Sequence, residues 1–230
     1  MKDIFLVDAD DTLLDFHGVA AEALRSTFTA FAIEWKEEYA KQFSEFNAGL
    51  WAALERKELT RDELMASRFC WFFEHIGLHE VDGKAFNQSF LNHIANNPRY
   101  IDGAQDFLEK LNQMGTVYIV TNGTLWIQEL RFAHSKLLNY ARDAFISDKI
   151  GCDKPSREYT EYVISHIDCF DKERAVWIGD SLSADIKGAR DAGITSIWFN
   201  PSKKEAIGSW QPDYNASSFE EILDYLKNNS

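Results

Sequence analysis

The stretch Phe5-Leu6-Val7-Asp8-Ala9-Asp10-Asp11-Thr12 places three carboxylates and a hydroxyl group directly after a short apolar run. An apolar run of this length, bounded by polar residues, is typical of a strand that is buried on both faces of a sheet. In an open α/β sheet, ligands bind at the carboxyl ends of the strands, where these carboxylates would emerge. Like charges this close raise each other's pKa unless a cation lies among them, and oxygen ligands suit Mg²⁺. The stretch therefore predicts a divalent-cation site.

A structural acidic turn is the alternative interpretation of the same residues. Aspartate often follows a strand because its side chain accepts a hydrogen bond from the backbone two residues on and can cap the next helix. The residues that follow the other predicted strands are therefore needed to distinguish a turn from a functional site.

Composition and charge narrow the class of protein. The 230 residues are 45% hydrophobic and 27% charged, which is ordinary for a globular enzyme. The formal net charge of −13 argues against a nucleic acid polymer or an anionic membrane as a partner, because both require clustered lysine and arginine. The apolar runs are far shorter than the roughly 20 residues of a transmembrane helix, and no basic segment followed by an apolar stretch opens the chain. We expect a cytoplasmic protein, and the sequence leaves its oligomeric state open.

The order of the apolar patterns predicts an α/β protein. From Leu14 to Pro98 the apolar residues recur at helical spacing, whereas beyond Pro98 short strand-like runs alternate with helical segments. The runs are 117–120, 144–146, 175–178 and 196–199, and the helical segments are 104–111, 126–137, 159–167 and 186–192. Such alternation predicts a Rossmann-like, doubly wound parallel sheet with right-handed crossovers.

The first strand belongs to this sheet although the helical block intervenes. We therefore expect an α/β core of residues 1–15 and 99–230, with an all-helical cap of residues 16–98 inserted after the first strand and placed above its carboxylates. Near the end of the chain, Ser218-Phe219-Glu220-Glu221 is a capping-box pattern that predicts a final helix.

Polar groups also follow the later strands. Thr121-Asn122-Gly123 supplies a hydroxyl and an amide that suit phosphate binding, and Gly179-Asp180-Ser181 is followed by Asp185 one helical turn further on. Between them lies Lys154-Pro155, where the proline can occupy the first position of a helix and hold the lysine at the end of the loop. Taken singly, each segment is usually a turn or a surface lysine. Their joint placement at successive strand ends favours a functional site.

These residues support one coherent chemistry. The carboxylates of Asp8 and Asp180, with the carbonyl oxygen of Asp10, could hold Mg²⁺. The ion and Lys154 would neutralise a phosphate group that the carboxylates otherwise repel. Asp8 can then attack phosphorus and form an aspartyl phosphate. Asp10 can protonate the leaving oxygen and later deprotonate water.

The four segments, in this order, resemble the motifs of the haloacid dehalogenase superfamily, and the helical insertion resembles that superfamily's first cap type. The resemblance implies a phosphatase with Asp8 as nucleophile and Asp10 as acid and base. It also implies Thr121 and Lys154 as phosphate ligands beside Asn122, Asp180 as a Mg²⁺ ligand, and Asp185 as a residue that acts on the ion through water.

A narrower resemblance extends into the insertion. Its residues, together with Asp11, are similar to those of bacterial 5′-nucleotidases that favour pyrimidine and noncanonical nucleoside monophosphates. The residues concerned are Asn47, Leu50-Trp51, Leu59-Thr60, Leu64 and Arg68-Phe69. Trp51 either stacks on the base or packs in the cap core. Glu58 and Asp102 depart from the usual glycine and proline of that group, which affects the expected loop geometry and leaves the chemistry unchanged.

Other functions share part of this pattern. A sugar-phosphate mutase or a phosphoglycolate phosphatase has the same core residues, whereas a haloacid dehalogenase has no need of Asp10. A phospho-receiver domain, the alternative that is not an enzyme, also combines an acidic Mg²⁺ site with a threonine and a lysine, but it carries no helical insertion. We expect a small phosphorylated metabolite as the partner, most specifically a nucleoside monophosphate.

Overall fold

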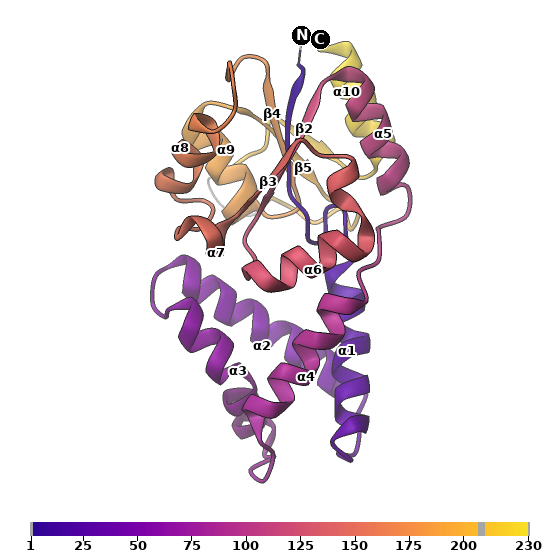
Figure 1. Ribbon diagram of the computed structural model, residues 1–230, viewed down its shortest axis with the longest axis vertical. Helices are drawn as coiled ribbons and strands as arrows, with labels where there is room; N and C mark the ends of the chain where they lie inside the picture. Colours follow the sequence, from indigo (N-terminus) through magenta and orange to yellow (C-terminus); the bar gives the residue numbers. More distant parts are fainter. Residues whose placement is uncertain (1, 207–209, 230) are drawn as a thin grey trace. The chain divides into compact units, whose positions relative to one another are not determined.

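The computed structural model describes residues 2–206 and 210–229 (Figure 1). The chain divides into two compact units. One contains the described residues up to Asp15 and from Arg99 onward, and the other is Phe16–Pro98. Within the described part of the chain, no helix combines the length and the apolar character needed to cross a membrane.

The larger unit is built on a six-stranded parallel sheet with the strand order β3-β2-β1-β4-β5-β6. The strands are β1 Ile4–Val7, β2 Thr116–Thr121, β3 Asp143–Ile146, β4 Ala175–Gly179, β5 Thr195–Phe199 and β6 Tyr214–Ala216. The chain begins at the centre of the sheet and proceeds outward in both directions, so β1 lies between β2 and β4. The predicted Rossmann-like α/β fold is confirmed, and β6 is a strand that was not predicted.

Helices cover both faces of this sheet, as a doubly wound fold requires (Figure 1). On one face, Phe5 and Val7 pack with α5 Ala104–Met114 and α10 Phe219–Asn228. On the other, Leu6 packs with α8 Arg157–Ser165 and α9 Lys187–Ala192. The remaining helical elements are α6 Leu125–Ser135, η1 Leu137–Asn139, α7 Ser147–Ile150 and the π-helical turn η2 Leu182–Ile186. β1 is buried along its whole length, as its apolar sequence predicts.

One helix start and one helix cap differ from the sequence prediction. Helix α8 begins at Arg157 because the Ser156 side chain caps it by accepting a hydrogen bond from the backbone N–H of Tyr159, so the placement of Pro155 in the first helical position was wrong. Helix α10 begins after Ser218, whose hydroxyl accepts from the backbone N–H of Glu221. The carboxylate of Glu221, however, accepts from the backbone N–H of Ser217, one residue before the expected partner.

The smaller unit consists of four helices around an aromatic core. The helices are α1 Phe16–Ala30, α2 Glu38–Glu55, α3 Arg61–Ile76 and α4 Gly83–Asn96. Phe43 and Phe69 stack with their ring centroids 4.8 Å apart, and Phe28 meets Phe86 edge to face at 5.2 Å. Aromatic pairs of this geometry stabilise a core beyond the effect of buried area alone. This unit therefore has a core of its own.

Arg68 is the unusual member of this core. The side chain is 2% exposed, its Nε donates to Asn87 Oδ1 at 2.8 Å, and its Nη1 lies 3.4 Å from Asn47 Oδ1. Its guanidinium lies 5.0 Å from the ring centroid of Phe90. Desolvation lowers the pKa of Arg68 to about 9, which shows how strongly this environment disfavours the charge. Arg68 on α3 thus links α2 and α4 through the side-chain oxygens of Asn47 and Asn87.

We expect Arg68→Met to lower the free energy of unfolding by about 1–3 kcal/mol, because it leaves the buried Asn87 oxygen without a donor. Urea unfolding measures the change. Adding Asn87→Leu should restore part of the loss, since the orphaned oxygen is then gone. The exposed Arg25→Met is the matched control and should change stability little. An unchanged midpoint in Arg68→Met would contradict this assignment.

Candidate active site

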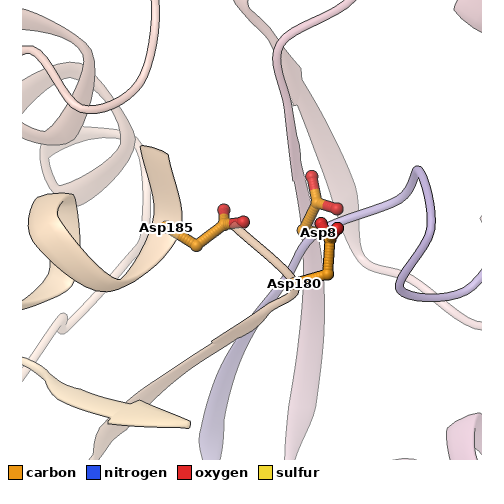
Figure 2. Close-up of side chains that lie close together, drawn as sticks. All are labelled: Asp8, Asp180 and Asp185. Carbon is orange, nitrogen blue, oxygen red and sulfur yellow. The ribbon is translucent and has the colours of Figure 1, made fainter. Parts of the chain in front are cut away.

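The carboxyl ends of three neighbouring strands bring the predicted acidic residues together. Asp8 follows β1, Thr121 ends β2 and Asp180 follows β4. Asp185 comes from the π-helical turn after β4. Figure 2 shows Asp8 and Asp180 side by side, with the carboxylate of Asp185 directed toward them. One carboxylate oxygen of each of these three aspartates lies within 4.8 Å of the others.

Lys154 provides a positive charge inside this cluster. Its Nζ donates to Asp8 Oδ1 at 2.6 Å, to Asp185 Oδ1 at 2.7 Å and to the carbonyl oxygen of Val120 at 3.0 Å. Asn122 fixes the backbone of the lysine, because its amide donates to Lys154 O and accepts from Lys154 N, both at 2.8 Å. The Asn122 side chain, predicted to contact substrate, thus has a partner within the chain.

Asp185 is held by donors from its own neighbourhood. Besides Lys154, its Oδ1 accepts from Trp177 Nε1 at 3.2 Å, and its Oδ2 accepts from the backbone N–H of Ser181. A Cβ atom on Gly179 would lie 2.2 Å from Asp185 Cγ, so only glycine fits before Asp180. With three donors inside the chain, Asp185 is a weaker candidate for direct metal binding than Asp8 or Asp180.

Several residues that hold this site were not among the predicted ones. Trp177 and the buried Trp198, whose Nε1 donates to the carbonyl oxygen of Asp180 at 2.7 Å, were interpreted only as strand core. A buried indole N–H needs an acceptor, which is the one signal that would have marked them. Gln128 and Arg131 on α6 were also missed, and both contact Asp10.

Asp10 has a different environment from Asp8. Its Oδ1 forms an ion pair with Arg131 Nη1, and its Oδ2 accepts from Gln128 Nε2 at 3.0 Å. Its side chain is 25% exposed, whereas that of Asp8 is 7% exposed. Thr12 donates to Asp8 Oδ2 at 3.0 Å, so both oxygens of the Asp8 carboxylate have a donor. The two aspartates of the opening motif are therefore held separately.

Burial and the neighbouring charges shift the pKa values of the side chains in this cluster. Desolvation raises the pKa of Asp8 to about 7 against the opposing charge of Lys154, and Asp185 adds to the rise. The pKa of Asp180 is raised well above its ordinary value by desolvation and then by Asp8. Although burial would lower the pKa of Lys154, Asp185 and Asp8 outweigh it and raise that pKa. The site is short of positive charge, and a cation would relieve this.

The donor set fits Mg²⁺. Asp8 and Asp180 offer hard oxygen ligands at neighbouring strand ends, and the raised pKa of each shows that ionising both beside the one positive charge of Lys154 is costly. The carbonyl oxygen of Asp10 stays a predicted third ligand. When bound, the ion would supply positive charge against a phosphate group.

Sheet topology and strand-end acids together define a Rossmann-like α/β enzyme. Residues 2–193 match the family model described as haloacid dehalogenase-like hydrolase, and the chain belongs to this family. It is 38% identical to the HAD-hydrolase YfnB of Bacillus subtilis over 96% of this chain and 94% of that protein. It is 36% identical to the pyrimidine 5′-nucleotidase PynA of Streptococcus pneumoniae, covering 97% and 94% of the two chains. The crystal structure of YfnB bound to magnesium superposes with a TM-score of 0.92 at 37% identity, covering 98% of each chain.

We expect Mg²⁺ to raise the melting temperature of chelator-treated protein, and the increment to grow from pH 5.5 to pH 8. A group whose pKa is raised on folding favours the folded state at low pH, and this contribution is lost as pH rises through the folded pKa. For Asp8 that loss runs from its ordinary pKa of 3.8 up to about pH 7, and above this pH the ion takes over from the proton. At 100 times its dissociation constant a ligand adds about 2.7 kcal/mol.

Asp180→Asn should remove most of this Mg²⁺ increment while the protein stays folded. The exposed Asp224→Asn on α10 is the matched control and should keep the full increment. Differential scanning calorimetry with and without Mg²⁺ makes the comparison. A full increment in Asp180→Asn would place the ion elsewhere.

Proposed function

We propose that this chain is a Mg²⁺-dependent phosphomonoesterase that works through an aspartyl phosphate on Asp8 and acts on nucleoside monophosphates. The observation that carries the proposal is the Asp8 carboxylate, which is bonded to Lys154 and lies beside Asp180. A second carboxylate, Asp10, is held separately two residues on. A structural turn needs neither a buried lysine nor two aspartates that are held by different partners.

The residues divide the reaction between them. Thr12 and Lys154 each bond one oxygen of Asp8 and so orient the carboxylate. A carboxylate oxygen of Asp8 attacks phosphorus, the bond from phosphorus to the ester oxygen breaks, and Asp10 gives that oxygen a proton. Asp10 then takes a proton from water as the water oxygen attacks phosphorus. The bond between phosphorus and Asp8 breaks, which releases inorganic phosphate and restores the carboxylate.

Support for a nucleotide substrate comes from the helical unit and from a relative. The similarity to PynA, named as a pyrimidine 5′-nucleotidase, extends over nearly the whole chain. In the helical unit, Trp51 is only partly buried, and the guanidinium of Arg61 lies 5.5 Å from its ring centroid. An aromatic ring in this setting can stack on a base. We assign substrate selectivity to this unit, with Trp51 as its base contact.

We expect pyrimidine nucleoside monophosphates to give a higher kcat/KM than hexose phosphates or phosphoglycolate. Phosphate release across such a panel is the test. On the same panel, Trp51→Ala should raise KM for nucleotides more than it lowers kcat, because stacking contributes to ground-state binding. The exposed Tyr162→Ala on α8 serves as the aromatic control.

The panel separates two failures. If phosphoglycolate or a hexose phosphate has the highest kcat/KM, the nucleotide assignment is wrong and the phosphatase assignment stands. If no phosphate ester is hydrolysed in the presence of Mg²⁺, the phosphatase proposal itself fails. An unchanged KM in Trp51→Ala would return Trp51 to a structural role.

A further inference from the structure

Two buried side chains on α6 contact the carboxylate of Asp10. Gln128 and Arg131 are each 1% exposed, and each bonds a different oxygen of the Asp10 carboxylate. We propose that Gln128 and Arg131 are positioning residues that hold Asp10 for proton transfer and Thr121 for phosphate binding. This inference rests on the proposed phosphatase function and deepens it.

Arg131 determines which way the Gln128 amide points. Its Nη1 donates to Gln128 Oε1 at 2.9 Å, and because a guanidinium has only donors, the amide oxygen must face it. Gln128 Nε2 is thereby directed to Asp10 Oδ2, at 3.0 Å. Arg131 Nη1 also pairs with Asp10 Oδ1. The orientation of the acid group thus follows from a donor-only residue in the core.

The same amide reaches a second residue of the site. Gln128 Nε2 lies 2.9 Å from Thr121 Oγ1, which accepts the hydrogen bond. A threonine hydroxyl carries a single hydrogen, and since Oγ1 accepts from Gln128, that hydrogen is left for another acceptor. A phosphate oxygen is such an acceptor. Gln128 therefore links the predicted acid and base, Asp10, to the predicted phosphate contact, Thr121.

Gly123 leaves room for Gln128. A Cβ atom at this position would lie 2.6 Å from Gln128 Cγ and 2.8 Å from both Cδ and Nε2. Gly123 is not among the described glycines with positive φ, so the backbone conformation alone has no need of glycine there. The glycine of Thr121-Asn122-Gly123 is explained by the path of the Gln128 side chain. A turn, the simpler interpretation of that segment, does not account for it.

Asp10 remains accessible although the residues that hold it are buried. Its side chain is 25% exposed, against 1% for that of Arg131. The carboxylate is therefore held by two buried donors while part of the Asp10 side chain stays exposed. General acid and base catalysis depends on hydrogen-bond reach, so a misplaced Asp10 should mainly slow the departure of poor leaving groups.

The test compares an alkyl phosphate with a nitrophenyl phosphate, whose leaving group needs little protonation. In Gln128→Met we expect kcat/KM to fall by about tenfold or more for a nucleoside monophosphate, a part of the roughly 10²–10⁴ that acid and base catalysis supplies. The aryl ester should lose less, because its leaving group needs no proton from Asp10 and only the loss that comes through Thr121 remains. Glu129→Met, an exposed neighbour on the same helix, is the matched control and should leave both rates unchanged.

Gly123→Ala should reproduce this selective loss by displacing Gln128, and it keeps the test available if Gln128→Met does not fold. Combined with Gln128→Met, it should cause little further loss, because the two changes act on one side chain and are not additive. Arg131→Lys should retain more alkyl activity than Arg131→Met, since it keeps a donor.

Equal losses for both esters, a gain in alkyl turnover, or fully additive effects of the two substitutions would overturn the inference. These outcomes differ from a failure of the proposed function. Wild-type protein that hydrolyses neither ester with Mg²⁺ would overturn both, whereas an active wild type with equal losses in the variants overturns only the role of α6.

Discussion

Asp8→Asn should abolish turnover of alkyl and aryl phosphates alike, because the substitution removes the attacking oxygen anion whatever the leaving group. Loss of a catalytic nucleophile typically lowers kcat by about 10⁴-fold or more. The asparagine is close in shape to the aspartate it replaces: its side-chain oxygen can still accept from Lys154, and its amide NH2 group can donate to the Thr12 hydroxyl. Phosphate release with saturating Mg²⁺ measures the effect. Assays with enzyme and substrate in equal amounts give the lowest turnover rate that can be detected.

The same variant has an expected effect on stability. The pKa of Asp8 is raised to about 7 by burial, so above that pH the ionised carboxylate opposes folding of the metal-free protein. Asp8→Asn removes this cost, and the metal-free variant at pH 8 should be at least as stable as the wild type. An inactive variant that has also unfolded would not support a nucleophile.

The neighbouring carboxylate gives a control within the same motif. Asp11 has a φ of 60°, a conformation that asparagine tolerates well, so Asp11→Asn should fold and retain most of the activity. Measurable turnover in Asp8→Asn would rule out the covalent route. Equal inactivity in Asp11→Asn would indicate that the motif acts through its total charge.

The position of the acidic cluster was predictable from the sequence because of how parallel strands end. Short apolar runs marked β1, β2 and β4, and the polar residues that follow these runs had to emerge at the same edge of the sheet. The closeness of Asp8 and Asp180 follows from pairing between β1 and β4, which no local pattern shows but which doubly wound topology favours. Local pattern and chain topology sufficed for this part of the site.

The residues that hold the cluster were not predictable in the same way. Gln128 and Arg131 occupy helical positions where the sequence offers only polarity, and their contact with Asp10 joins segments more than 100 residues apart. Trp177 and Trp198 read as strand core because burial, and not the indole N–H, dominates the pattern. Side-chain partners of this kind are set by tertiary packing.

Short elements were also beyond the reach of periodicity. Strand β6 has three residues, Tyr214–Ala216, which is too short to show an alternation of apolar and polar positions. Its place at the edge of the sheet follows from pairing with β5. The shift of the Glu221 contact to Ser217 is likewise a matter of one residue in backbone position, which a sequence pattern does not determine.

Asp10→Asn should separate the two half-reactions where Asp8→Asn stops both. Attack by Asp8 remains possible, but the leaving oxygen of a nucleoside monophosphate has no proton donor, so we expect kcat/KM for such esters to fall by about 10²–10⁴-fold. The structure adds to this loss. Arg131 keeps the oxygen of Gln128 turned toward itself, so the new amide of residue 10 meets either the Gln128 N–H group or the Arg131 N–H group, and both are donors.

With a nitrophenyl phosphate the same Asp10→Asn enzyme should release a burst of phenol, close to one equivalent per enzyme, followed by slow turnover. The burst is expected because this leaving group departs without protonation, and the slow phase because hydrolysis of the aspartyl phosphate lacks its base. Stopped-flow absorbance of the phenol gives the amplitude and both rates, and wild-type enzyme at the same concentration is the reference. Gln128→Met leaves the Asp10 carboxylate in place but less well held. Its rate of phosphoenzyme hydrolysis should lie between those of the wild-type and Asp10→Asn enzymes. Equal losses for alkyl and aryl esters with no burst would remove Asp10 as acid and base and leave it only a part in holding the ion.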